Sequence, residues 1–226
     1  MIQLGPLMMN FELLIFMLSA FTGYLALKYR SSKADVEESI SDKFVTALIL
    51  SFITWKFSLI IFDPVSVIRY PMSLLYFNGG DKGLWLAIVI SIAFLWMRSR
   101  KDGSSLWVNM DLLSTGLIVG SAIYHLLILT KDSTNLLFHA LYILLMVGLL
   151  IFLFTNKKSV GNPIVMNQFV IWFSLGMIGV FFTEKDRMYL ILSFSKEQIV
   201  LFFIFIIAIF AGNFLDKKKM RRWNDG

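Results

Sequence analysis

Apolar residues gather in long runs along the chain, separated by short polar stretches. Each run approaches the roughly 20 residues that a helix needs to cross a bilayer, although the third is shorter and is expected to begin earlier or irregularly. The seven runs cover residues 8–27, 44–62, 83–97, 112–129, 136–154, 166–182 and 199–215. They predict an all-α integral membrane protein with seven transmembrane helices in a single domain, 1–226, whose last residues, 216–226, form a basic tail.

The fourth run has two different faces when residues 111–129 are placed on a helical wheel. Gly116 and Gly120 lie on one side, which indicates close packing against a neighbouring helix. A narrow polar stripe lies on the other side and contains Asp111, Ser114, Ile118, Ser121 and His125. Because polar groups avoid lipid, this stripe is expected to face the protein interior.

Composition supports the membrane class. Hydrophobic residues make up 58% of the chain and charged residues 16%, a balance that no soluble domain of this length has. The chain has no cysteine, which excludes disulfides, iron–sulfur clusters and thiolate metal sites. With only two histidines as well, we expect neither a metal site nor a cofactor.

Basic residues fix the predicted orientation. If the N-terminus is outside, inner loops and the tail hold most of the 21 lysines and arginines, whereas each outer loop carries as many acidic as basic residues. The positive-inside rule therefore predicts an external N-terminus and a cytoplasmic C-terminus. The basic tail is expected to rest on anionic inner-leaflet lipid, with no nucleic-acid partner.

Three ionisable residues share one predicted depth. Glu12, Lys56 and His125 each lie roughly 6 to 9 Å below the outer boundary, at 1.5 Å of rise per residue. Each would cost roughly 2.5 to 3.5 kcal/mol at a lipid-facing helix centre, so a polar cavity opening to the outer leaflet is predicted. Other polar residues that enter spans from this side are His139, Tyr142 and Gln198.

Structural roles compete with binding roles for each of these residues. Lys56 can extend its ammonium to the outer headgroups, or Glu12 and Lys56 can form a structural ion pair. His139, near a helix start, suits an interfacial position. His125 can be an interhelical hydrogen-bond partner instead of a base.

The loop between the second and third runs contains a glycine turn, Asn78-Gly79-Gly80-Asp81. Such a sequence favours positive φ and brings backbone amides together. It could receive a phosphate oxygen, or it could be only a turn.

Several stretches of the chain match one family pattern in order and spacing. They are Leu4-Gly5-Pro6, Lys28-Tyr29-Arg30, the segment around Lys56, Asn78-Gly79-Gly80, Met110–Leu113, Leu141–Gly148 and Lys196–Ile199. Together they resemble the prolipoprotein diacylglyceryl transferase family, seven-span bacterial enzymes that move the diacylglyceryl group of phosphatidylglycerol to a lipoprotein cysteine. Lys56 takes the place of an arginine in the family's Gly-Arg-Leu-Gly-Tyr-Val-Leu-Phe segment, and Asn78-Gly79-Gly80 is similar to its Asp-Gly-Gly turn.

The chain departs from this family pattern where the family's site residues are expected. The family's essential histidine after the glycine turn is missing, because the chain passes from Gly80 through Asp81 and Lys82 directly to Gly83. His125 stands where the resemblance implies a headgroup-binding arginine. Uncharged residues replace an asparagine, two glutamates and a second arginine of the family, and they are Ile128, Ile143, Val147 and Gly179.

The resemblance implies a multi-pass protein of the bacterial cytoplasmic membrane that binds a phosphatidylglycerol-like phospholipid or a lipoprotein segment, with weakened or lost transferase activity. His125 is the candidate catalytic base. The candidate substrate-binding residues are Glu12, Lys56, Asn78, Gly79, Gly80, His139, Tyr142 and Gln198. Two alternatives are a non-enzymatic accessory subunit that contacts another membrane protein and an active transferase with a rebuilt site. A small transporter is a weaker alternative, since no inverted repeat supports it.

Overall fold

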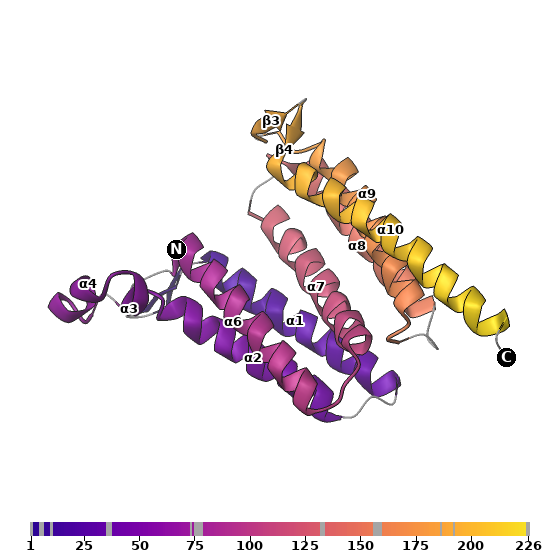
Figure 1. Cartoon of the computed structure of the whole chain (residues 1–226). Coiled ribbons are helices and arrows are strands. Elements are labelled where there is room, and N and C mark those ends of the chain that lie inside the picture. Colours follow the sequence, from indigo (N-terminus) through magenta and orange to yellow (C-terminus); the bar gives the residue numbers. More distant parts are fainter. Residues whose placement is uncertain are drawn as a thin grey trace. The chain divides into compact units, whose positions relative to one another are not determined.

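The computed structural model (Figure 1) describes residues 2–4, 7–9, 11–34, 38–72, 74, 79–131, 134–155, 160–185, 187–191 and 193–224. Helices hold most of these residues, as the apolar runs predict. The chain forms two compact units: unit 1 contains Met1–Asp35 and Leu106–Gly226, and unit 2 contains Val36–Ser105. A single membrane domain over the whole chain stays a prediction.

Unit 1 contains five long helices: α1 (Phe11–Lys33), α7 (Leu106–Leu129), α8 (Leu136–Thr155), α9 (Pro163–Phe181) and α10 (Lys196–Asn224). Helix α1 packs on α7, and α7, α8, α9 and α10 then pack in chain order. Apolar side chains of α7, α8, α9 and α10 form a continuous core, made by Ile118, Met146, Leu149, Leu153, Met166, Phe169, Met177 and Leu201.

Glycines set the contact between α1 and α7. A Cβ atom on Gly23 would lie 2.5 Å from the carbonyl oxygen of Gly116, and a Cβ on Gly120 would lie 3.0 Å from the carbonyl oxygen of Ser19. Only residues without a side chain allow the two backbones to approach this closely. The prediction that Gly116 and Gly120 pack against a neighbouring helix is therefore confirmed, and the neighbour is α1.

Unit 2 is built on one pair of helices, α2 (Glu38–Lys56) and α6 (Gly80–Lys101). The Ser91 hydroxyl donates to the Ser51 hydroxyl across this pair, over 2.9 Å. Two short helices, α3 (Leu59–Phe62) and α4 (Pro64–Arg69), follow α2. Small hydroxyl side chains thus bring α2 and α6 together, as in membrane helix pairs.

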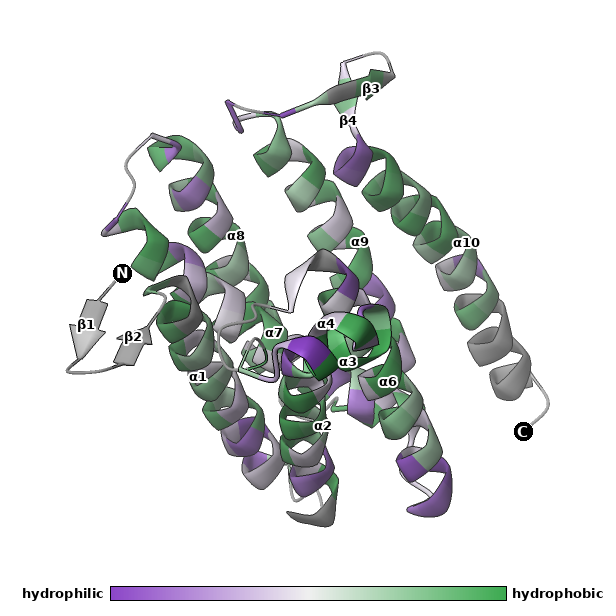
Figure 2. Cartoon of the chain, turned by 90° about the vertical axis from the view of Figure 1, so that its left-hand side faces the viewer, coloured by the Kyte–Doolittle hydropathy of each residue, from purple (hydrophilic) through white to green (hydrophobic). Residues whose placement is uncertain are grey.

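Five helices are long and apolar enough to cross a membrane among the described residues. They are α6 (from Lys82), α7, α8, α9 and α10 (to Leu215). Figure 2 shows apolar residues along α7 to α10 and hydrophilic ones at the first turn of α10. Large apolar side chains also point outward, such as Leu144 at 67% and Phe210 at 70% exposure. Such an apolar surface is typical of a membrane protein, in which lipid takes the place of water around the helices.

Helices also occupy the first two predicted spans, but α1 and α2 are not among the five. The second predicted span, 44–62, is not one continuous helix, because α2 ends at Lys56 and α3 begins at Leu59. The helix of the third predicted span, α6, begins at Gly80, before the predicted start at residue 83, in agreement with the expected earlier start. Seven spans and their orientation remain predictions.

Two small antiparallel hairpins add strands that the all-α prediction did not include. The first joins β1 (Ile2–Leu4) to β2 (Leu7–Met9). The second joins β3 (Tyr189–Ile191) to β4 (Phe194–Ser195) and leads directly into α10. Both are too short to carry a clear period-2 pattern in the sequence.

Candidate functional site

His125 and His139 meet where α7 approaches α8. His125 lies near the end of α7 and His139 in the first turn of α8, so the two helices bring their imidazoles together across the loop that joins them. Their Nδ1 atoms are 2.7 Å apart. His139 is 9% exposed, and His125 is half-buried. The structure thus places the candidate base beside a second candidate residue.

A hydrogen bond between two Nδ1 atoms constrains the protons of both rings. One histidine must donate its Nδ1–H, while the other accepts with a bare Nδ1 and, when neutral, keeps its proton on Nε2. If both rings became imidazolium, both Nδ1 atoms would carry protons and the bond would break. The intact pair therefore carries at most one positive charge.

Aromatic rings surround this pair. The ring of Tyr142, one turn after His139 on α8, lies 3.8 Å from the His125 ring, centroid to centroid. The rings of Tyr124 and Phe138 approach His125 edge-on, each at 5.7 Å. A side-chain hydrogen bond also links Tyr142 to Ser121. The predicted polar stripe of α7 thus faces the protein interior at Ser121 and His125, as expected, and the neighbour there is α8.

These contacts define what the site can do chemically. A neutral imidazole pair can take up one proton, so the His125–His139 pair can act as a general base. Once protonated, it can donate a charge-assisted hydrogen bond to an anion. Apolar rings around it lower the local polarity and strengthen such an electrostatic interaction. The His125–His139 pair can therefore accept one proton or, when protonated, bind one singly charged anion.

Two residues of the predicted glycine turn, Gly79 and Gly80, are described in unit 2. Gly80 adopts a positive φ of 60°, as the turn sequence predicts. A Cβ on Gly79 would lie 2.3 Å from the carbonyl oxygen of Trp55, and the Ser58 hydroxyl donates to the carbonyl oxygens of Trp55 and Gly79. The turn therefore packs on the end of α2. Phosphate binding there stays a prediction.

Of three other candidates, Asn78, Glu12 and Lys56, only Lys56 is described with its side chain. Asn78 and the side chain of Glu12 lie outside the described residues. Lys56 is the last residue of α2 in unit 2 and is half-buried. A layer shared by Glu12, Lys56 and His125 therefore stays a prediction.

Gln198 has a structural role that the sequence interpretation missed. Its Oε1 accepts from the backbone N–H of Ser195 over 2.9 Å, while its own N–H donates to the Ser195 hydroxyl over 3.3 Å. This reciprocal pair is a capping box at the start of α10. The Gln198 Nε2 also donates to the carbonyl oxygen of Ile178. The signal was present as Ser-x-x-Gln before an apolar run.

A second buried polar pair lies at the opposite ends of α7 and α8, and the sequence interpretation did not pair its members. Arg30 Nε donates to Asp111 Oδ1 over 2.5 Å, with side-chain exposures of 3% and 0%. Arg30 Nη1 also donates to the carbonyl oxygen of Leu153, and Asp111 Oδ2 accepts from the Gly161 N–H. The pair thus joins α1, α7, α8 and the turn before α9.

Comparison with known proteins gives one informative similarity. No protein-family model matches the chain, and no solved structure matches it. The chain is 24% identical over 123 residues to a phosphatidylglycerol–prolipoprotein diacylglyceryl transferase of Shouchella clausii. The similar stretch covers 54% of this chain and 44% of that protein, so this chain matches less than half of the relative's length. The similarity supports a distant relationship to a transferase of this type.

Proposed function

We propose that this protein binds a phosphatidylglycerol-like phospholipid, or a lipoprotein segment, at the His125–His139 pair, with weakened or lost diacylglyceryl transfer. The observation that carries the proposal is the 2.7 Å contact between the two imidazoles in an aromatic setting inside a membrane-type helix bundle. The similarity to a transferase whose name includes phosphatidylglycerol and a prolipoprotein supports this choice of ligand.

Charge favours a phosphodiester as the ligand. The intact histidine pair carries at most one positive charge, and the phosphodiester of phosphatidylglycerol carries one negative charge. Binding the anion therefore favours the singly protonated pair, so affinity should rise as the pH falls toward the point where the pair gains its first proton. Tyr142 supplies a ring face and a hydroxyl beside the same site.

The same chemistry explains why transfer would be weak. Thioether formation needs a base for the lipoprotein thiol and cations for the departing glycerol phosphate. The histidine pair can supply the base or one cation, but it lacks the bidentate geometry with which guanidinium groups hold a phosphate. Two positions that carry charged residues in the family, Val147 and Gly179, are uncharged and exposed on α8 and α9. We therefore expect a protein that binds the lipid but transfers its diacylglyceryl group inefficiently.

The proposal includes the membrane arrangement. Seven spans, an external N-terminus and a location in the bacterial cytoplasmic membrane would place the histidine pair near the outer leaflet, where both the phospholipid and a lipoprotein precursor are accessible. A polar cavity that also contains Glu12 and Lys56 belongs to this hypothesis. An accessory role beside another membrane protein is the second candidate, and the uncharged Val147 and Gly179 favour it.

Native mass spectrometry of the detergent-purified protein tests lipid binding. The wild type should retain phosphatidylglycerol, and His125→Ala combined with His139→Ala should reduce the retained lipid about tenfold, because a charge-assisted hydrogen bond is lost. Ser114→Ala is the matched control, since Ser114 lies on the same stripe of α7 but away from the pair. Equal lipid retention in all three proteins would refute the proposal.

Expression in bacterial cells depleted of their own transferase tests the chemistry separately. We expect lipoprotein maturation to be restored weakly or not at all, despite good membrane expression. Full restoration that depends on His125 would instead identify an active transferase with a rebuilt site. Co-purification of a stable second protein, without retained lipid, would favour the accessory role.

A further inference from the structure

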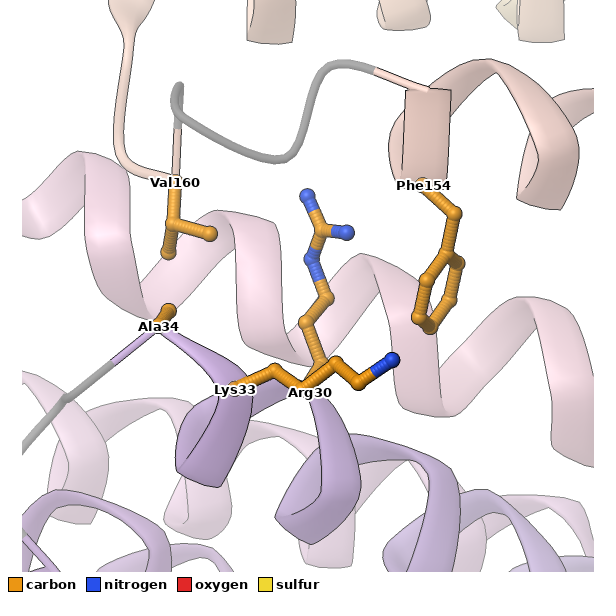
Figure 3. Close-up of a pocket in the computed structure, with 5 residues that line it drawn as sticks. All are labelled: Arg30, Lys33, Ala34, Phe154 and Val160. Atoms are coloured by element: carbon orange, nitrogen blue, oxygen red, sulfur yellow. The ribbon is translucent and has the colours of Figure 1, made fainter.

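A small pocket lies beside the buried Arg30–Asp111 pair. It has a volume of about 40 Å³ and is lined by Arg30, Lys33, Ala34, Phe154 and Val160 (Figure 3). The lining residues come from the last turn of α1 and the residue after it, the end of α8 and the turn before α9, all in unit 1. One water molecule needs roughly 10 to 15 Å³ of cavity volume. The pocket therefore accommodates one small polar group and no whole lipid.

Arg30 supplies the pocket with hydrogen-bonding capacity that its neighbours do not use. Two of its nitrogens are bonded, Nε to Asp111 and Nη1 to the carbonyl oxygen of Leu153. The third, Nη2, is buried and has no partner among the described residues. A buried N–H donor without an acceptor is unfavourable, and buried arginine N–H groups are rarely left without a hydrogen bond. An acceptor bound in this pocket would satisfy it.

The charges around the pocket favour an anionic acceptor. Asp111 neutralises one of the two cations, Arg30 and Lys33, which leaves one net positive charge. The Asp111 carboxylate is also held by the Gly161 N–H at 3.4 Å. The Lys33 Nζ atom lies 4.8 Å from the centre of the Tyr29 ring, and the Arg30 Cζ atom lies 5.2 Å from the centre of the Phe154 ring. The apolar walls made by Phe154 and Val160 strengthen any ionic contact inside.

We propose that this pocket binds one phosphate-type oxyanion. A planar guanidinium edge with an unused N–H matches phosphate oxygens, and Lys33 adds a second cation at the rim. The source is either the headgroup of an anionic phospholipid, whose acyl chains would lie outside along α1 and α8, or a free phosphate. The volume fits the phosphate group alone in both cases.

This site is separate from the histidine pair. His139 and Phe154 are both on α8 and lie about 15 residues apart, which corresponds to roughly 22 Å along the helix axis. The pocket is therefore at the end that the charge pattern predicts to be cytoplasmic. It does not rest on the function proposed for the histidine pair, and the two hypotheses can fail independently.

Isothermal titration of the full chain in detergent tests the site, with inorganic phosphate in one arm and dioctanoyl phosphatidylglycerol in the other. We expect saturable binding in at least one arm: binding of inorganic phosphate identifies a free-phosphate site, and binding of the lipid alone identifies a headgroup site if it is retained in His125→Ala/His139→Ala. No saturable binding in either arm overturns the proposal.

Three variants connect the binding to this pocket. The double variant Arg30→Gln/Asp111→Asn removes both charges together, so it leaves no unpaired buried ion, and should weaken binding about tenfold. Lys33→Gln should weaken it less, and Ala34→Phe should block it by filling the pocket. Lys28→Gln, an exposed lysine on the same helix that does not line the pocket, is the matched control and should bind like the wild type.

The variants leave no ambiguous result. Weaker binding in Lys33→Gln and Ala34→Phe, with Lys28→Gln unchanged, supports the site even if the double variant fails to fold. Phosphate binding that survives in Lys33→Gln and Ala34→Phe, or that falls equally in Lys28→Gln, overturns it. Lipid binding overturns it when it survives Ala34→Phe in the His125→Ala/His139→Ala background, where the histidine pair is removed. Loss of the lipid arm in His125→Ala/His139→Ala, with that arm retained in Ala34→Phe, would assign the lipid to the histidine pair and overturn the headgroup form of the proposal.

Discussion

Unit 1 carries a buried polar pair toward each end of α7, and the two pairs are built differently. Asp111 holds Arg30 through a direct ion pair, and both side chains have further backbone partners. His125 and His139 share one proton between neutral rings, and aromatic groups surround them. The first pair is an ion pair that joins three helices. The second can gain a proton, so it can change state when a ligand or the pH changes.

This difference separates stability from function. A buried ion pair that loses one partner leaves an uncompensated charge, which makes it a strong structural contact. A shared-proton histidine pair loses much less when one ring is removed, because neither ring must be charged. We therefore expect mutations at the Arg30–Asp111 end mainly to unfold the protein and mutations at the histidine end mainly to change binding.

The largest expected effect is that of Asp111→Ala. It should lower the free energy of unfolding by about 3 to 5 kcal/mol, because Arg30 would stay buried without its counter-ion. Equilibrium unfolding in mixed micelles with increasing sodium dodecyl sulfate measures this change. Replacing both residues, Arg30→Met with Asp111→Leu, should cost much less.

Asp102→Ala is the matched control for this experiment. It removes a surface ion pair in which Arg98 Nε lies 3.5 Å from Asp102 Oδ2, with side-chain exposures of 55% and 21%, and pairs at the surface contribute about 0 to 1 kcal/mol. If Asp111→Ala were no more harmful than Asp102→Ala, the Arg30–Asp111 pair would not be the structural contact described here.

Gly23→Ala tests whether the two ends are independent. The new Cβ would lie 2.5 Å from the Gly116 carbonyl oxygen, so α1 must move away from α7 at a cost of about 1 to 3 kcal/mol. This movement should loosen the contact between Arg30 and Asp111. The histidine pair, which joins α7 to α8, should keep its ¹⁵N imidazole resonances.

Gly148→Ala is the control for Gly23→Ala. Gly148 is also inside a helix, but its Cβ would meet nothing within 4 Å, so the substitution should stabilise the protein by about 0.5 to 1 kcal/mol. A change in the imidazole resonances of Gly23→Ala as large as that caused by direct mutation of His139 would show that the two ends are coupled.

His139→Ala should have a smaller effect on stability, about 1 to 2 kcal/mol, because it leaves the His125 Nδ1 without its partner. In the wild type, ¹⁵N spectra should show one ring protonated at Nδ1 and the other at Nε2. Acidification that converts both rings to imidazolium should remove the hydrogen bond. The free energy of unfolding should therefore fall as the pH falls. Two rings with the same tautomer at neutral pH would contradict the shared-proton arrangement.

The helix positions and the two faces of α7 were predictable, because length, hydropathy and the 3.6-residue period are local properties of the sequence. The close packing of Gly116 and Gly120 against a neighbouring helix follows from the same period, but the identity of that neighbour, α1, does not. The partners were not predictable: Asp111 is 81 residues from Arg30, and their pairing depends on the register between helices. The break between Lys56 and Leu59 was also missed, because Phe57 and Ser58 carry no glycine or proline signal.

The candidate site was predicted only in part for the same reason. His125, His139 and Tyr142 were identified as single polar residues in apolar runs, which is a property of composition. Their mutual geometry depends on how the loop after α7 turns α8 back against it. Gln198 was assigned to ligand binding because its polarity was visible while its partner, the backbone of Ser195, was not considered. Capping signals at helix starts are therefore best interpreted before binding roles are assigned.

Gln198→Ala has the smallest expected effect and decides to which class Gln198 belongs. Gln198 lies at the start of α10, near the end of α9, where its side chain forms hydrogen bonds with the backbone of Ser195 and Ile178. Loss of a capping interaction should cost about 1 kcal/mol, and Ser195→Ala should cost a similar amount. Because the two residues cap each other, the double variant should be less destabilised than the sum of the single variants.

Lipid retention in the same variant distinguishes a cap from a ligand contact. A residue whose amide is already bonded on both sides has little capacity left for a headgroup, so Gln198→Ala should retain phosphatidylglycerol like the wild type while its unfolding midpoint falls. The opposite pattern, unchanged stability with lost lipid, would place Gln198 in the binding site with His125 and His139. The histidine end would then be a larger polar site that reaches α10, and the contrast with the Arg30–Asp111 end would rest on ligand contacts as well as on charge state.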